Sequence, residues 1–226
     1  MMKRSRSVTV PLLLALLATL SSACARPSET EAHAHPAAGK VSAPQATAEA
    51  TTSGINAGTA SLSVQELEAR LLRFVDAFKA PSDMSSRRLE TALGIKLGPP
   101  LDTSDPWYRV KDVPLADGYT LYATHFPMKR GFSRMEISVR LPGGEDPTRK
   151  PTAICIWDAA VLSKKLEAMG YKAGERMPFQ NGWIRQHWRS INNGKQGFSV
   201  ALLIYQSGEE ASRECAFGLQ IDGGDA

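Results

Sequence analysis

The chain has 226 residues, enough for one full domain or two small ones, and its 42% apolar content is ordinary for a globular protein. The formal net charge is +4, but three basic residues, Lys3, Arg4 and Arg6, belong to the N-terminal segment. Without them, 24 basic and 23 acidic side chains leave a net charge of +1. This balance argues against nucleic acid as a partner.

The first 23 residues have the pattern of an export signal, with three basic side chains before an apolar run over residues 8–20. Two cleavage patterns overlap at Cys24. Residues 20–24 resemble a bacterial lipobox, in which the cysteine is lipidated, although the usual branched apolar residue is here Ser21. Ala23-Cys24-Ala25 also fits ordinary signal peptidase. We therefore expect an outer-membrane lipoprotein facing the periplasm, or a soluble periplasmic protein if Cys24 is not lipidated.

Residues 24–60 consist mainly of Ala, Thr, Ser, Glu, Pro and Gly, a composition that predicts a disordered tether. His33 and His35 lie in this segment. Two imidazoles on a disordered chain make a weak metal site, so we expect no metal there. No nucleotide, metal or cofactor motif occurs in the rest of the sequence, and export also separates the chain from cytosolic ATP and nicotinamide. We therefore expect no cofactor.

The globular part is predicted to span residues 61–226 and to begin with two helices. Ser63 and Glu66 have capping-box spacing, and the apolar positions that follow recur at helical spacing up to Phe78. Pro81 ends this run. A second, shorter helix is predicted from Ser85 or Ser86 to Gly94, which can adopt the positive φ of a helix C-terminus.

Strands are predicted over residues 107–113, 119–126 and 133–141, where apolar and polar residues alternate. A polar loop over residues 142–151 leads to a short alternating run, residues 152–157, that contains Cys155. Asp158 is a suitable N-cap for a helix that ends at Gly170. Four further strands are predicted over residues 171–180, 183–191, 198–206 and 213–221. Asn181-Gly182 and Asn193-Gly194, which separate the first three of them, both predict type I′ turns.

Apart from Cys24, the cysteines are Cys155 and Cys215, an even pair in an oxidising compartment. A disulfide between them would close a loop of about 60 residues. The alternative is a pair of buried free thiols.

These elements predict an α+β fold in which two to three helices pack on an antiparallel sheet. Leu89-Glu90 and Leu166-Glu167 begin similar stretches, each of which ends a helix at a glycine before strands. The chain could thus form one domain or two related units, 61–145 and 152–226. This organisation resembles the tandem helix-plus-sheet units of the β-lactamase inhibitory protein family. The resemblance implies a binding role.

The predicted binding surface is on residues 183–189. In a strand, Trp183, Arg185, His187 and Arg189 share one face, and Trp and Arg are enriched at binding hot spots. The alternative is that Ile184 and Trp188 are core residues and the opposite face is merely solvated. Residues 129–132 are a second candidate contact.

No catalytic motif is recognisable, so we expect a binding protein rather than an enzyme. The preferred hypothesis is an inhibitor or immunity protein that binds another envelope or secreted protein, such as a periplasmic hydrolase. A cell-envelope hydrolase with His125 or His187 as general base is one alternative. A structural lipoprotein of envelope assembly is another.

Overall fold

The computed structural model describes residues 61–102, 104–208 and 213–225. The predicted export signal, Cys24, and the tether with His33 and His35 lie outside these residues. Within them, no helix combines the length and the apolar character needed to cross a membrane.

Three helices and eight strands make up the described part of the chain. The helices are α1 (Val64–Asp76), α2 (Ser86–Leu93) and α3 (Ala159–Ala168). The strands are β1 (Tyr108–Pro114), β2 (Thr120–Pro127), β3 (Ser133–Arg140), β4 (Trp157–Asp158), β5 (Lys172–Phe179), β6 (Gly182–Ile191), β7 (Gln196–Ser207) and β8 (Arg213–Asp225). Short 3₁₀ turns lie at Pro81–Asp83, Ala116–Gly118, Lys129–Gly131 and Asn192–Gly194.

All strands belong to one antiparallel sheet in the order β1-β2-β3-β8-β7-β6-β5, and β4 pairs with β8. Two meanders, β1 to β3 and β5 to β8, meet where Ile137 of β3 lies opposite Leu219 of β8. The predicted α+β class is confirmed. This pairing also places the strands of both predicted units in one continuous sheet. Whether the two parts are related repeats stays a prediction.

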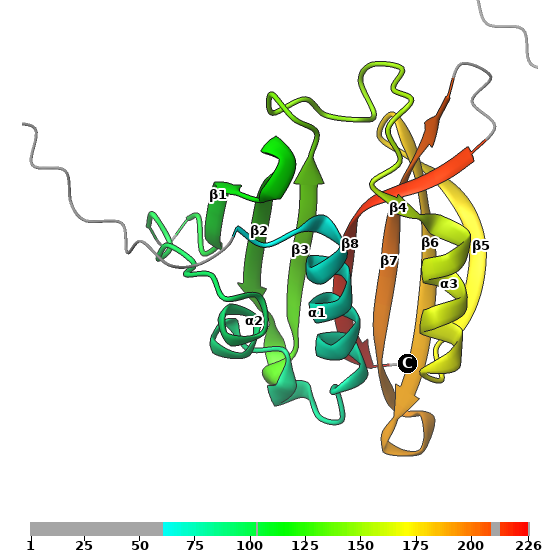
Figure 1. The fold of residues 1–226 in the computed structure, drawn as a ribbon. Coiled ribbons are helices and arrows are strands. Elements are labelled where there is room, and N and C mark those ends of the chain that lie inside the picture. Colours follow the sequence, from blue (N-terminus) through cyan, green and yellow to red (C-terminus); the bar gives the residue numbers. More distant parts are fainter. Residues whose placement is uncertain (1–60, 103, 209–212, 226) are drawn as a thin grey trace, which may run out of the picture. The chain divides into compact units, whose positions relative to one another are not determined.

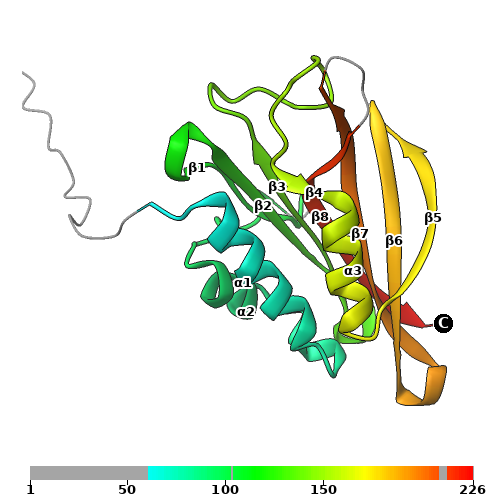
Figure 2. The same ribbon diagram turned by 45° about the vertical axis from the view of Figure 1, so that its right-hand side comes forward.

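The three helices lie on the same side of the sheet (Figures 1 and 2). Leu67, Leu71 and Val75 of α1 and Leu162 and Leu166 of α3 are buried there against the strands. Strand residues of the same core include Ile137, Val200, Leu202, Leu219 and Ile221. Among the described residues no helix lies on the opposite side of the sheet, which is called the uncovered face below.

Local sequence signals account for the helix ends. The Ser63 hydroxyl accepts from the Glu66 amide at 3.1 Å, and Asp158 accepts from the Val161 amide at 3.0 Å. The capping box is only half formed, because the Glu66 carboxylate bonds to Arg70 and Arg73 of its own helix. Gly94 and Gly170 have φ of +73° and +86°, as predicted for residues that end a helix.

Two local predictions are wrong. The run over residues 152–157 was expected to form a strand, but residues 152–156 do not. Of this segment, only Trp157 pairs with β8, together with the following Asp158. At the hairpin between β5 and β6, the positive φ is at Gln180, whereas Gly182 already belongs to β6. The hairpin is thus in the predicted place, but the type I′ turn over Asn181-Gly182 is not formed.

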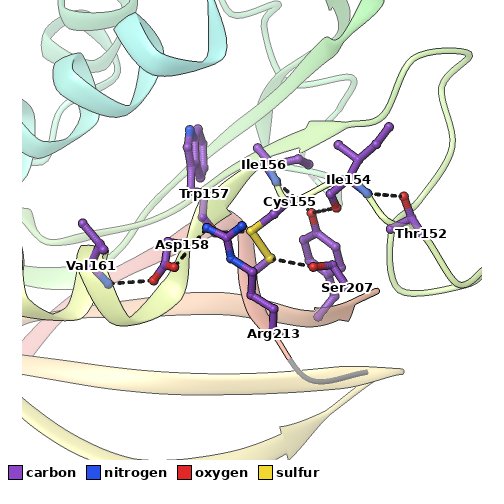
Figure 3. Close-up of a disulfide and its surroundings, with 11 residues drawn as sticks. Thr152, Ile154, Cys155, Ile156, Trp157, Asp158, Val161, Ser207 and Arg213 are labelled. Atoms are coloured by element: carbon purple, nitrogen blue, oxygen red, sulfur yellow. Dashed lines mark hydrogen bonds and ion pairs between the residues drawn. A yellow bond between two sulfur atoms is a disulfide. The ribbon is translucent and has the colours of Figure 1, made fainter. Parts of the chain in front are cut away.

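Cys155 and Cys215 form a disulfide with a Cα–Cα distance of 5.4 Å, which confirms the predicted bond (Figure 3). The irregular segment before β4 is also held by Tyr205 of β7. Its hydroxyl accepts from the Ile156 amide and donates to the Ile154 carbonyl, both at 2.9 Å. The disulfide and these bonds compensate for the missing strand pairing of this segment.

Candidate functional site

The predicted binding surface on β6 faces the helices. Trp183, Arg185, His187 and Arg189 do share one face of the strand, but His187 lies opposite Val200 of the core. His187 Nε2 is 2.8 Å from the Ser163 hydroxyl of α3, and its side chain has no exposed surface. The prediction that His187 contacts a partner is therefore wrong, because α3 covers it.

Arg189 joins two helix ends. Its guanidinium donates to the carbonyls of Val75 and Asp76 in the last turn of α1, of Phe78 just after it, and of Met169 just after α3, at 2.7–3.3 Å. It also lies 4.4 Å from the centre of the Tyr171 ring. These contacts engage the side chain within the fold, and its predicted role in partner binding stays a prediction.

Trp183 and Arg185 are half-buried beside the covered core. The Arg176 guanidinium lies 4.8 Å from the centre of the Trp183 ring, and Arg185 is 4.0 Å from the Glu214 carboxylate. Neither contributes to a surface with His187 or Arg189. The predicted four-residue binding face is therefore not assembled.

Both histidines of the globular part pair with a serine. His125 Nε2 lies 2.9 Å from the Ser133 hydroxyl, much as His187 Nε2 lies near Ser163. All four side chains are buried, and burial lowers the pKa of both imidazoles below the usual range of histidine. A serine that no substrate can reach cannot act as a nucleophile, so these pairs serve the packing of the core.

The uncovered face of the sheet is formed by the alternate residues of the same strands. Glu136 of β3 lies opposite Thr124 of β2 and Gln220 of β8. Beside them, Tyr122 lies opposite Ser138. On β6, Ile184 and Trp188 belong to this face, so the alternative interpretation that placed them in the core is wrong. The centre of the face is polar.

A pocket of about 560 Å³ lies on this face. Tyr122, Glu136 and Ser138 line it from the central strands, and Phe217 lines it from β8. Its other walls come from β1, from the end of β3 and the loop after it, and from the hairpin between β5 and β6. They include Lys111, Asp112, Arg140, Asp146, Arg149 and Gln180. Segments far apart in the sequence thus meet at one site.

Glu136 is the unusual group of this pocket. Its carboxylate has no hydrogen bond or ion pair to another described residue, and burial raises its pKa above the usual range of glutamate. By contrast, Asp146 accepts from the Thr148 hydroxyl at 2.7 Å and pairs with Arg149 at 3.4 Å. The pocket therefore contains one carboxylate whose charge the fold leaves uncompensated.

The wall from β1 is shaped by an irregularity in the strand. The pairing of β1 with β2 shifts register between Val110 and Val113, and Asp112 within this bulge has φ +55°. A bulge redirects side chains, and Lys111 and Asp112 here both line the pocket. Five other non-glycine residues of the described chain also have positive φ, so this conformation of Asp112 is explained by the bulge and is not by itself a sign of function.

Two other surfaces are less distinctive. A groove between α1 and α2 has four arginines along it, but three of them pair with Glu66 or Asp83. In the 3₁₀ turn Lys129–Gly131, Arg130 pairs with Asp225 of β8. Within the ranges that the structure describes, no group of His, Cys, Asp and Glu side chains could hold a metal ion.

The chain matches no protein-family model, and comparisons with curated proteins and with solved structures give no match either. The site therefore rests on its own geometry.

Sequence reasoning missed the pocket, although one signal was present. The alternation over residues 133–141 puts Arg134, Glu136, Ser138 and Arg140 on the polar side of the strand, which is the side that forms the pocket floor. The residues that lie beside them on the pocket floor could not be identified from the sequence, because these residues belong to strands that pair with strands distant in the sequence. Only the pairing of β3 with β8 brings Phe217 to Glu136.

Proposed function

We propose that this chain is an exported binding protein that recognises another protein through the uncovered face of its sheet. The observation that carries the proposal is the polar pocket around Glu136, which is accessible and lined by segments far apart in the sequence. In the described part of the chain, the two histidines that could serve as a general base are buried under helices or loops. This favours binding over hydrolysis.

Three features of the pocket suit protein recognition. The aromatic rings of Tyr122 and Phe217 supply contact area, and the charged side chains of Lys111, Arg140 and Arg149 surround it. The helix-covered side offers little of this kind, since its arginines are largely engaged within the fold. The proposed site is therefore on the side of β6 opposite to Arg185 and Arg189.

The export pattern of the sequence supports an envelope setting, and the proposed partner is an envelope or secreted protein such as a periplasmic hydrolase. Lipidation at Cys24 would hold the protein at the outer membrane, facing the periplasm. An inhibitor or an immunity protein is the form of binding protein that this setting favours. A role in envelope assembly would use the same face with a structural partner.

The test is capture of a partner by the exported chain, compared with two charge-reversed variants. Lys111→Glu/Arg140→Glu changes the pocket rim, and Arg73→Glu/Arg87→Glu changes the helix side by the same charge. We expect one protein to be captured in stoichiometric amounts by the wild type and by the helix-side variant, and to be lost in the rim variant. Equal capture by both variants, or no capture by a folded protein, would contradict the proposal.

A further inference from the structure

The strongest unexplained feature of the pocket is the carboxylate of Glu136. Its position on β3 is central in the sheet, between Thr124 and Gln220, and neither neighbour bonds to it. A partly buried carboxylate without a partner is unfavourable, whereas the same group facing a cation is stabilised. A cation placed against this half-buried carboxylate would therefore be stabilised.

The cations of this face do not neutralise Glu136. Arg149 pairs with Asp146, Arg109 of β1 pairs with Asp105, and Arg140 is directed to the Gly144 carbonyl at 3.5 Å. Lys111 is exposed at the rim, next to Asp112. None of them forms an ion pair with Glu136 in the described residues, so the floor of the pocket is negative while its rim carries both charges.

The remaining lining suits an alkyl chain that ends in a positive charge. Tyr122 and Phe217 present aromatic rings, against which methylene groups pack and cations are attracted to the ring face. Asp112, placed at the rim by the bulge in β1, adds a second acceptor. The volume of about 560 Å³ lies within the range of small-molecule pockets, which also accommodates one long side chain.

We propose that the pocket binds a single alkylammonium or alkylguanidinium group, with the charge against the Glu136 carboxylate and the alkyl stem along Tyr122 and Phe217. Two sources have this chemistry: a Lys or Arg side chain of a protein partner, and a free small amine. The first source rests on the function proposed above, and the cation site itself does not.

The cation site is tested without a partner. Glu136 is titrated by side-chain ¹³C NMR in the folded protein with n-butylammonium or n-butylguanidinium chloride, and with potassium chloride at equal ionic strength. We expect both organic cations, but not potassium, to lower the apparent pKa of Glu136 and to shift the ring signals of Tyr122 and Phe217. Glu136→Gln should abolish the ring shifts, and the exposed control Glu175→Gln on β5 should keep them.

Two results would overturn the cation site. Either the cations shift the ring signals of Glu136→Gln as much as those of the wild type, or sodium butyrate produces the shifts and the cations do not. The latter would identify an anion site built from Lys111, Arg140 and Arg149.

The source is identified with a captured partner. If the group is a partner side chain, Glu136→Gln should weaken the complex by about tenfold or more, because a buried charge is left unpaired. Unchanged affinity, together with binding of the probes, excludes the partner side chain and identifies a free amine. Capture through the pocket face without any probe effect refutes the cation site alone. Probe binding without capture of any protein refutes protein recognition alone.

Discussion

Replacement of Arg189 by alanine should destabilise the protein strongly, although the residue was predicted from the sequence to bind a partner. The side chain is 16% exposed and reaches four carbonyl oxygens at the ends of α1 and α3. Helix C-termini leave carbonyls unsatisfied and carry negative partial charge, so a guanidinium at this place serves both helices.

The size of the effect follows from these contacts. Each hydrogen bond from a charged donor contributes roughly 1.5–3 kcal/mol. The four carbonyl oxygens accept from only two guanidinium nitrogens, so we count about three independent hydrogen bonds. Water can replace some of them in the variant, which reduces the expected net loss to about 3 kcal/mol. For a domain of this size, that corresponds to a decrease in Tm of about 6–12 °C.

The assay is urea and thermal unfolding of Arg189→Ala beside Arg185→Ala. Arg185 lies on the same face of β6, but its nearest carboxylate is 4.0 Å away and it bonds to no helix carbonyl. We expect Arg185→Ala to change the free energy of unfolding by about 0.5 kcal/mol or less. The reasoning is refuted if Arg189→Ala is as stable as wild type, or if both variants lose the same free energy.

Three further outcomes are expected. Reduction of the disulfide between Cys155 and Cys215, which are 60 residues apart, should lower the free energy of unfolding by about 4 kcal/mol. Urea unfolding with and without reductant measures this loss, and an unchanged midpoint would contradict it. Gly223→Ala should lower the free energy of unfolding by about 1–3 kcal/mol, because the added methyl group would overlap the Phe132 ring. Gly224→Ala should not, because there is open space around that residue. Equal Tm values for the two variants would contradict this expectation. Glu136→Gln should be more stable than wild type at alkaline pH, and this advantage should vanish below about pH 4.3, because the raised pKa of Glu136 destabilises the folded protein only while the carboxylate is ionised. A wild type that is the more stable at alkaline pH would count against an uncompensated charge.

Much of the fold could be predicted because its signals are local. Ser63, Ser85 and Asp158 cap the three helices, and Gly94 and Gly170 end two of them. Alternation located seven of the eight strands. Each of these features depends on the side chain and backbone preferences of a few adjacent residues.

The sequence could not show that the predicted binding face is the helix-covered one, because alternation separates two faces without showing which of them is covered. Trp183 and Trp188 put an aromatic residue on each side of β6, so composition could not distinguish the sides. The docking of α3 decides the question, since Ser163 reaches His187 across 24 positions of sequence. Similarly, the strand predicted over residues 152–157 is mostly irregular, because Tyr205 and the disulfide hold that segment in place of a neighbouring strand.

The covered and uncovered faces treat their polar groups differently, and this difference supports the placement of the site. On the covered face, His187 and Arg189 are buried with hydrogen-bond partners, and Arg189 meets four carbonyls. On the uncovered face, Glu136 lacks a partner and Asp112 holds a positive φ, two features that cost stability without improving the packing. Sequences that fold well keep such conflicts few, and those that persist concentrate at functional sites. Both residues line the same pocket; the bulge in β1 accounts for the positive φ of Asp112, and the proposed cation would supply the partner that Glu136 lacks among the described residues.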